Sequence, residues 1–301
     1  MKMSTLFKQL AVGVGFSTVL VGSAMAGTLI TSFDYTQEFE FVNPITPASV
    51  NKEGTTSTLD DVDGYTKLSW GTESNSFDKI SSLVINPEAL DRTTPSGNLS
   101  QGTVTTATDI NAMVFELGPM ITHNNFVITG SSLTSASAQD NVILTPFGGG
   151  VDQTQAITFG VLFEETPNAQ NPCSSGAVNS FGCGDIFVLS GGLLGIPTIV
   201  NNTELAFLID SFVRDGYLYQ VFLNTVSGAL GQLSDLACAE AGADSGCIGF
   251  TTFENQSNSF QLQFAMLATE QIPEPATIGL LAGSLLLMGW VRRKKVNGLS
   301  A

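Results

Sequence analysis

Residues 157–163 read ITFGVLF, with apolar side chains at the alternate positions Ile157, Phe159, Val161 and Phe163. Successive side chains of a β-strand point to opposite faces, so this period of two places all four side chains on one face. Such a strand covers a hydrophobic core on one side. The stretch therefore predicts a half-buried strand of an antiparallel sheet.

Short runs of the same kind continue in both directions along the chain, rich in aromatic and β-branched residues and bounded by Gly, Pro or Asn. These further strands are predicted at 33–42, 65–70, 80–85, 113–117, 126–129, 142–147, 186–189, 205–212, 217–225, 249–253 and 260–267. One helical turn fits within 230–243. The pattern predicts an all-β domain, an antiparallel β-sandwich or jelly roll. Residues 27–272 contain no Pro-rich linker and no fixed-period repeat, so we expect one domain.

The N-terminal residues 1–26 have the three parts of a secretory signal peptide. Lys2 and Lys8 form a basic region, residues 10–21 are apolar, and Ala24-Met25-Ala26 is a small-x-small cleavage site. We therefore expect export, with cleavage by signal peptidase before Gly27.

The C-terminal residues combine a short motif, an apolar run and a basic end. Pro273-Glu274-Pro275 precedes the uncharged run 276–291, and Arg292-Arg293-Lys294-Lys295 follows it. As a helix, this run would reach about 24 Å, at the short end of a membrane span. Clustered cations beside a span stay on the cytoplasmic side. We expect one transmembrane helix here.

This tail, residues 273–296, resembles the PEP-CTERM sorting signal of Gram-negative bacteria. The resemblance implies recognition by an exosortase, a membrane protease-transpeptidase. It also implies an intermediate anchored in the inner membrane, and then a place at the cell surface or in the extracellular matrix. Whether the tail is cleaved or retained is left open by the sequence.

The charge of the mature region is strongly negative. Residues 27–272 hold five Lys and Arg against 26 Asp and Glu, a net charge of −21. Such a surface repels phosphate backbones and excludes nucleic-acid binding. The acidic residues are scattered, which favours a role in solubility, and binding of divalent cations is the alternative.

The four cysteines occur as two close pairs in turn-rich segments. Four cysteines allow three connectivities, and proximity favours Cys173–Cys183 and Cys238–Cys247. Disulfides of this kind form and persist in an oxidising compartment. The rival interpretation is a zinc site, but neither the spacing nor the distant His123 matches a metal-finger pattern.

A second resemblance lies within the mature region. Thr122-His123-Asn124-Asn125 matches the motif that names the THxN group of PEP-CTERM proteins. The segments LSWGT (68–72), SSLVI (81–85) and ITFGVLFEETPN (157–168) are also similar to that group. The resemblance implies an exported all-β protein, and it transfers no catalytic residue to this chain.

His123 is the only histidine, so any imidazole acid–base chemistry requires it. Nearby hydroxyls at Thr122, Thr129 and Ser131 could complete a triad, but no Gly-x-Ser-x-Gly nucleophile elbow is present. The favoured interpretation is structural: Thr122, His123 and Asn125 form or pack a corner between two strands. We predict no catalytic residue and no enzyme.

The segment Asp60-Asp61-Val62-Asp63-Gly64 is the best metal candidate of the sequence. Asp61 and Asp63 before a Gly form a fragment of a Ca²⁺ loop, but Trp70 stands where the loop needs its bidentate Glu. A solvated turn is favoured, with no cofactor, and Ca²⁺ is the alternative. Glu164 and Glu165 are adjacent, so in a strand they point to opposite faces. Their spacing does not exclude a carboxylate pair for glycoside hydrolysis, since separation in space is not visible in the sequence.

The sequence leaves three functions open. The leading one is a non-enzymatic surface or matrix protein that serves structure or adhesion and associates with exopolysaccharide. A carbohydrate-binding module requires Trp70 or the Tyr217/Tyr219 face to be exposed beside a concave sheet. A secreted hydrolase requires an acid or a hydroxyl within hydrogen-bond reach of His123 in a cleft.

Overall fold

The computed structural model describes residues 27–56, 59, 64–73, 79–85, 99–170, 172–191, 197–226 and 230–271. Residues 27–270 form one compact unit. The predicted signal peptide, the sorting signal and the candidates Asp61 and Asp63 lie outside the described residues. Within the described part of the chain, no helix has the length and apolar character needed to cross a membrane.

The all-β prediction is confirmed, because 62% of the described residues are in strands and 4% are helical. The strands are β1 (Ser32–Thr46), β2 (Asn51–Thr56), β3 (Gly64–Trp70), β4 (Thr72–Glu73), β5 (Ser81–Ile85), β6 (Leu99–Ala107), β7 (Glu116–Asn125), β8 (Ile128–Thr129), β9 (Ser135–Pro146), β10 (Gln153–Glu164), β11 (Val178–Asn179), β12 (Gly182–Cys183), β13 (Ile186–Ser190), β14 (Thr198–Val200), β15 (Glu204–Arg214), β16 (Tyr217–Thr225), β17 (Gly231–Gln232), β18 (Ile248–Thr251) and β19 (Gln256–Glu270). The helices are the 3₁₀ helix η1 (Ile110–Ala112) and α1 (Asp235–Glu240).

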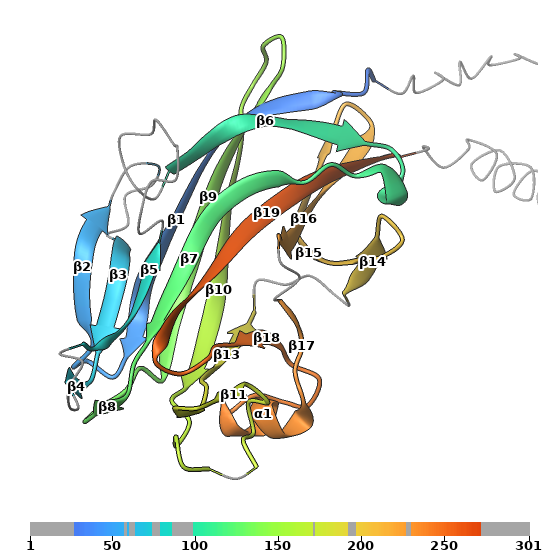
Figure 1. Cartoon of the computed structure of the whole chain (residues 1–301). Helices are drawn as coiled ribbons and strands as arrows, with labels where there is room; N and C mark the ends of the chain where they lie inside the picture. Colours follow the sequence, from blue (N-terminus) through green and yellow to red (C-terminus); the bar gives the residue numbers. More distant parts are fainter. Residues whose placement is uncertain are drawn as a thin grey trace, which may run out of the picture. The chain divides into compact units, whose positions relative to one another are not determined.

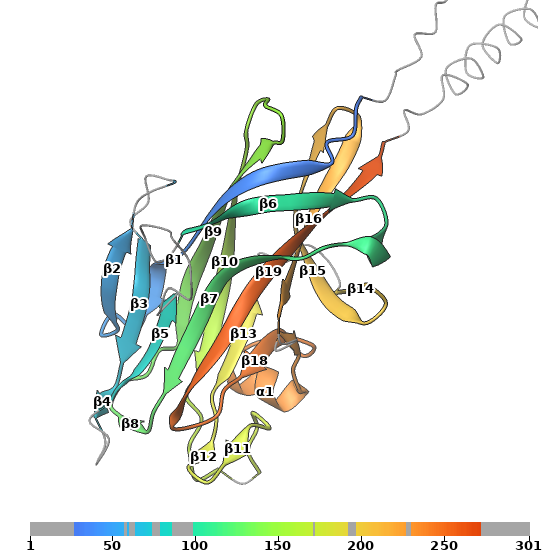
Figure 2. The same ribbon diagram turned by 45° about the horizontal axis from the view of Figure 1, so that its top comes forward.

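Fifteen of these strands form one large sheet, which runs in the order β14-β15-β16-β19-β7-β5-β3-β1-β9-β10-β13-β18-β17. β2 pairs with β3, and β6 pairs with both β1 and β19. The pairings are antiparallel except that of β6 with β19. The sheet folds over on itself, with β7 and β19 in front of β9 and β10 (Figures 1 and 2). Two layers with a shared interior are consistent with the predicted sandwich.

The core lies between these layers. On β10 the side chains of Ile157, Phe159, Val161 and Phe163 are all buried, as their alternation predicts. They join Phe39 and Phe41 of β1, Phe264 of β19 and their neighbours in one cluster. Each such side chain contributes about 1.5–3 kcal/mol when fully buried.

The hairpin between β15 and β16 shows how local sequence sets the register. Asp215 and Gly216 both have positive φ, 47° and 76°, as the two-residue turn of a tight hairpin requires. Arg214 therefore pairs directly with Tyr217. Glycine adopts this conformation without steric cost, and Asp is one of the side chains that tolerates it.

The predicted corner at Thr122–Asn125 is wrong. These residues are the last part of β7, which pairs with β5 on one side and β19 on the other. Thr122 and Asn124 point to one face, where they bond serines of the neighbouring strands: Thr122 Oγ1 lies 2.8 Å from Ser259 Oγ, and Asn124 Nδ2 donates to Ser82 Oγ at 3.0 Å. Thr122 and Asn124 are residue types common in turns, but here their side chains form hydrogen bonds between neighbouring strands.

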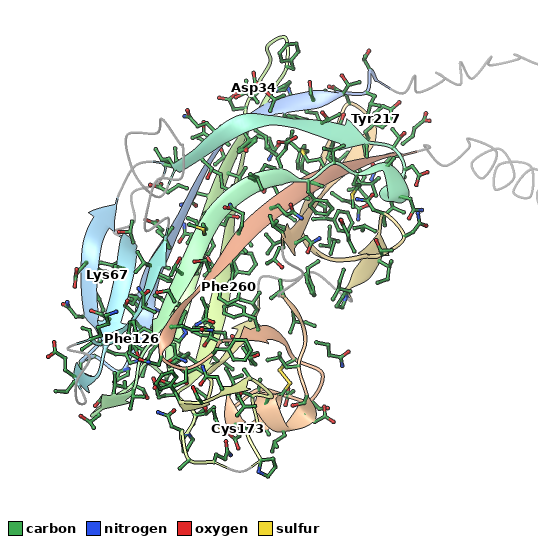
Figure 3. The ribbon with its side chains drawn as sticks, viewed as in Figure 1. Asp34, Lys67, Phe126, Cys173, Tyr217 and Phe260 are labelled. Carbon is green, nitrogen blue, oxygen red and sulfur yellow. A yellow bond between two sulfur atoms is a disulfide. The ribbon has the colours of Figure 1, made fainter. Side chains whose placement is uncertain are left out.

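The helix and both disulfides belong to one end of the sandwich. Ser234 caps α1, its hydroxyl accepting the Ala237 N–H at 3.2 Å, within the range where a helical turn was predicted. Cys173 is bonded to Cys183 and Cys238 to Cys247, which is the predicted pairing. Figure 3 shows Cys173 at the same end as α1.

Candidate functional site

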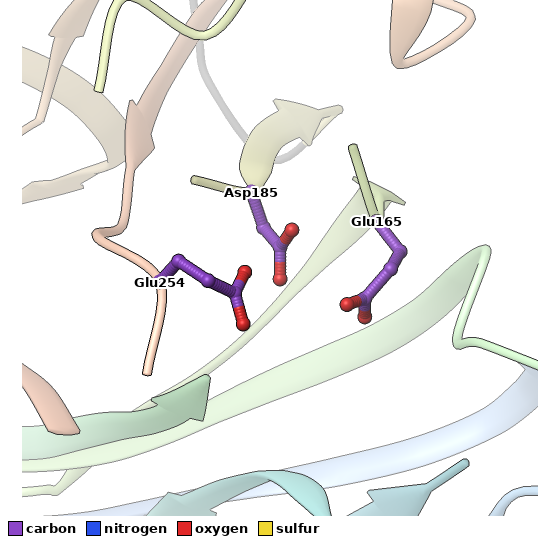
Figure 4. A group of neighbouring side chains, drawn as sticks. All are labelled: Glu165, Asp185 and Glu254. Atoms are coloured by element: carbon purple, nitrogen blue, oxygen red, sulfur yellow. The ribbon is translucent and has the colours of Figure 1, made fainter. Parts of the chain in front are cut away.

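Three carboxylates from distant parts of the chain converge at this end of the sandwich. They belong to Glu165, Asp185 and Glu254, and Figure 4 shows their oxygens pointing toward one another. One oxygen of each lies within 4.8 Å of the corresponding oxygens of the other two. Asp185 and Glu254 are 0% exposed, and Glu165 is partly buried. We refer to these three residues as the carboxylate cluster.

The pairing of three strands places the cluster. Ile186 of β13 pairs with Glu164 of β10 and with Thr251 of β18. Asp185 therefore lies beside both Glu165, which follows β10, and Thr252, which follows β18. The Thr252 N–H donates to the Asp185 carbonyl at 3.0 Å and extends this pairing.

A turn and a loop complete the placement. Glu254 stands in the turn that leads into β19, where Asn255 has a φ of 57°. After β10, Thr166 donates its N–H to Asp185 Oδ1 at 3.1 Å and its hydroxyl to the Gly184 carbonyl at 2.8 Å. The backbone around Asp185 is thus fixed by neighbours on both sides.

β7 supplies two more polar side chains from the opposite layer. His123 and Asn125 share one face of this strand, and both are fully buried. His123 Nδ1 lies 2.9 Å from Thr252 Oγ1, and its Nε2 lies 3.8 Å from Asp185 Oδ2. Asn125 Nδ2 donates to the same Thr252 hydroxyl at 3.4 Å.

Aromatic rings close the inner side of the cluster. Trp70, at the end of β3, stacks on His123 with ring centroids 5.7 Å apart and donates its Nε1–H to Glu165 Oε2 at 3.3 Å. Phe163 and Phe187 contact the imidazole edge-on, with centroids 5.6 and 4.8 Å away. The segments LSWGT (68–72), THNN (122–125) and ITFGVLFEETPN (157–168) therefore meet at one place.

Several polar atoms of this place have no hydrogen-bond partner among the described residues. They are His123 Nε2, Asn125 Oδ1 and Asp185 Oδ2. The Glu254 carboxylate has the Asn255 N–H and the Asn125 side chain as hydrogen-bonding neighbours, and both lower its pKa. A buried polar group without a partner costs about 1–3 kcal/mol, and a charged one costs more. The arrangement therefore calls for a proton or a cation among these atoms.

Burial disfavours the charged form of every titratable group in the site, so it raises the pKa of the carboxyls and lowers that of the imidazole. It raises the pKa of Glu165 to about 8, with the Trp70 hydrogen bond opposing and the charge of Glu254 adding to the rise. It raises the pKa of Glu254 to about 7. It also raises the pKa of Asp185 well above its usual value, and the nearby charge of Glu165 adds to that rise. The pKa of His123 falls to about 3 for the same reason, so the imidazole is neutral.

The hydroxyl, imidazole and carboxylate of Thr252, His123 and Asp185 follow one another as in a catalytic triad. The geometry does not favour that chemistry, since all three side chains are fully buried. The 3.8 Å between Asp185 and the imidazole is too long for an orienting hydrogen bond. A base with a pKa of about 3 is also poorly matched to proton transfer near neutral pH.

The aromatic residues considered for sugar binding lie in the core. Trp70 is 3% exposed and Tyr219 is 0% exposed, with its ring stacked on Phe212 and its hydroxyl accepting the Ile30 N–H. Tyr217 is partly buried and packs against the same core. A carbohydrate-binding face needs exposed aromatic rings, and neither Trp70 nor Tyr219 is exposed.

The sequence identified part of this site. His123, Asn125, Trp70 and Glu165 were singled out, and the structure brings them together. Glu164 points to the opposite face of the strand, where burial raises its pKa and the charge of Glu240 adds to the rise. Asp185 and Glu254 were missed, since they follow no local spacing, and the Gly184-Asp185 pair before a predicted strand was the only available hint.

An apolar cavity lies deeper between the layers. It has a volume of about 50 Å³ and is lined by residues such as Phe39, Phe159 and Phe260. A space of this size is a packing void rather than a pocket for a ligand.

The chain matches no family model and no curated protein.

Proposed function

We propose that this chain is an exported, non-enzymatic protein of a Gram-negative cell surface or extracellular matrix, where it serves structure or adhesion in association with exopolysaccharide. In this proposal, signal peptidase removes residues 1–26, and residues 27–272 form the β-sandwich ectodomain. Residues 273–296 are the PEP-CTERM signal with its transmembrane helix, which anchors the intermediate until an exosortase processes it.

The pair of disulfides is the observation that carries this proposal. Both bonds lie within the all-β unit, and the described residues include no free cysteine. Disulfides persist in oxidising compartments and are rare in a reducing cytosol. They support the export that the two ends of the sequence predict.

The burial of the titratable groups supports a non-enzymatic role. His123, Asp185 and Glu254 are fully enclosed by the strands and turns that carry them. Groups that act on a substrate belong to a cleft, and these three side chains are closed off from solvent. The net charge of −21 between residues 27 and 272 suits a soluble extracellular surface.

The sorting step tests the proposal. In a host with an exosortase, replacing Pro273-Glu274-Pro275 by three alanines should leave the protein uncleaved and retained in the membrane. Immunoblots of the membrane, cell-surface and medium fractions measure this. The variant Gln271→Ala, next to the motif, serves as the control and should be processed normally. Release of the triple-alanine variant at the wild-type level would contradict the proposal.

A further inference from the structure

We propose that Glu165, Asp185 and Glu254 bind one divalent cation, Ca²⁺, where β10, β13 and β18 meet. This site is separate from the sorting signal and does not depend on the proposed function. It also differs from the Asp61–Asp63 segment, which the sequence offered as the calcium candidate.

The separation of the carboxylates suits one ion. Ca²⁺ binds oxygen at about 2.3–2.6 Å, so two ligands on opposite sides of the ion lie up to about 5 Å apart. The three carboxylate oxygens lie within 4.8 Å of one another. One ion placed among them can therefore contact an oxygen from each residue.

The charge of the cluster requires compensation. Burying a carboxylate is costly unless a cation or a strong hydrogen bond accompanies it. Among the described residues, no Lys or Arg forms an ion pair with Glu165, Asp185 or Glu254. A divalent ion neutralises most of the three negative charges at once.

His123 provides an observation independent of the acids. Its Nε2 is fully buried, lacks a hydrogen-bond partner and faces Asp185 Oδ2 at 3.8 Å. The Thr252 hydroxyl accepts the Asn125 N–H, so it can donate its own proton to His123 Nδ1. The imidazole proton then sits on Nε2, toward Asp185. Asp185 Oδ2 is also buried and has no hydrogen-bond partner among the described residues, so its lone pairs are available to a cation.

The donor atoms favour calcium over zinc. All three clustered side chains offer carboxylate oxygens, and neither a His nor a Cys belongs to the group. Ca²⁺ takes six to eight oxygen ligands in flexible geometry, whereas Zn²⁺ prefers nitrogen and sulfur. Extracellular calcium modules bind with dissociation constants of about 0.1–1 mM, and we expect a value in or below this range.

Thermal unfolding of the full-length protein, purified from producing cells and stripped with EDTA, tests the site. Saturating CaCl₂ should raise the wild-type Tm by about 5–10 °C. Glu254→Gln should abolish this shift, yet should melt no lower than wild type in EDTA because it removes one buried charge. Glu73→Gln, at an exposed acid outside the cluster, should keep the full shift. No shift in wild type, or an equal shift in Glu254→Gln, would overturn the proposal, as would a shift with ZnCl₂ but not CaCl₂.

Terbium luminescence locates the ion. Tb³⁺ replaces Ca²⁺ at oxygen sites and emits when a nearby tryptophan transfers energy to it. Trp70 contacts Glu165 directly, so the chain with Trp290→Phe should sensitise Tb³⁺, and excess Ca²⁺ should quench the emission. Adding Trp70→Phe should remove it. Emission unchanged by Trp70→Phe would place the ion elsewhere and overturn the assignment.

Discussion

His123 lies at the boundary between an aromatic cluster and a polar one. Its ring contacts Trp70, Phe163 and Phe187, while its two nitrogens face Thr252 and Asp185. Burial keeps the imidazole neutral, which suits a side chain that packs and accepts a hydrogen bond from Thr252 rather than one that exchanges protons. A role in packing was predicted from the sequence, but a role in a corner was not correct.

Replacing this residue should therefore cost stability. His123→Ala removes a buried ring and the contact with Thr252, a loss on the order of 2–4 kcal/mol, which lowers Tm by roughly 5–15 °C. Asn124→Ala, on the opposite face of β7, is the matched control and should cost less. Melting curves recorded beside a panel of hydrolase substrates provide the measurement. A wild-type activity that disappears in His123→Ala without a change in Tm would favour an enzyme instead.

At the scale of elements, strands were predictable where their own side chains alternate. Ile157–Phe163 was found because one face is apolar and buried. β6, LSQGTVTTA, was missed since only its Val104 is a buried large apolar residue, and its strand conformation comes from pairing with β1 and β19. β9 begins earlier than predicted, at Ser135, because the small residues Ala136 and Ala138 face the core there.

The carboxylate cluster was beyond prediction for a related reason. Glu165, Asp185 and Glu254 are far apart in sequence, and they meet only because β13 pairs with both β10 and β18. No local period encodes that pairing. The sequence revealed the half of the site that lies within recognisable segments, namely Trp70, His123 and Glu165.

The burial of the carboxylate cluster at these strand ends predicts that the stability of the fold depends on pH. In the absence of Ca²⁺, the pKa values of Glu165 and Glu254 rise from 4.5 to about 8 and about 7 on folding. Each of these two carboxyls holds more protons in the folded state than in the unfolded chain, so its contribution to stability falls as pH rises from about 4.5 to about 8. His123, whose pKa burial lowers from 6.5 to about 3, opposes this trend below about pH 6.5, so we expect the steepest fall between pH 6.5 and 8. Urea unfolding in EDTA at pH 5, 6, 7 and 8 measures the slope.

Glu254→Gln should make this slope shallower. Asp140, whose pKa burial raises to about 7, contributes equally to both proteins, so the difference between the two curves reports the cluster. Saturating Ca²⁺ should flatten the wild-type curve as well, because the ion displaces the protons. Parallel curves for the two proteins in EDTA would show that the cluster does not titrate as inferred.

At the scale of the whole unit, one sheet supplies both layers. β1 and β19 each pair with strands along both edges, and β6 joins them, so the two layers share backbone hydrogen bonds as well as one main core cluster. β13 connects this core to α1, because Phe187 faces the main cluster while Ile186 and Val188 pack with Ala237. No described segment of 27–270 has a separate large core.

This continuity predicts that residues 27–270 unfold as one cooperative unit. Trp70 reports the end with the carboxylate cluster, and far-UV circular dichroism reports all strands, so in the Trp290→Phe chain both signals should change with the same midpoint. Because the ion would bind within that unit, CaCl₂ should move both midpoints together and by the same amount. A Trp70 transition that precedes the loss of strand signal, or that alone responds to CaCl₂, would mean that this end opens independently of the rest of the sandwich.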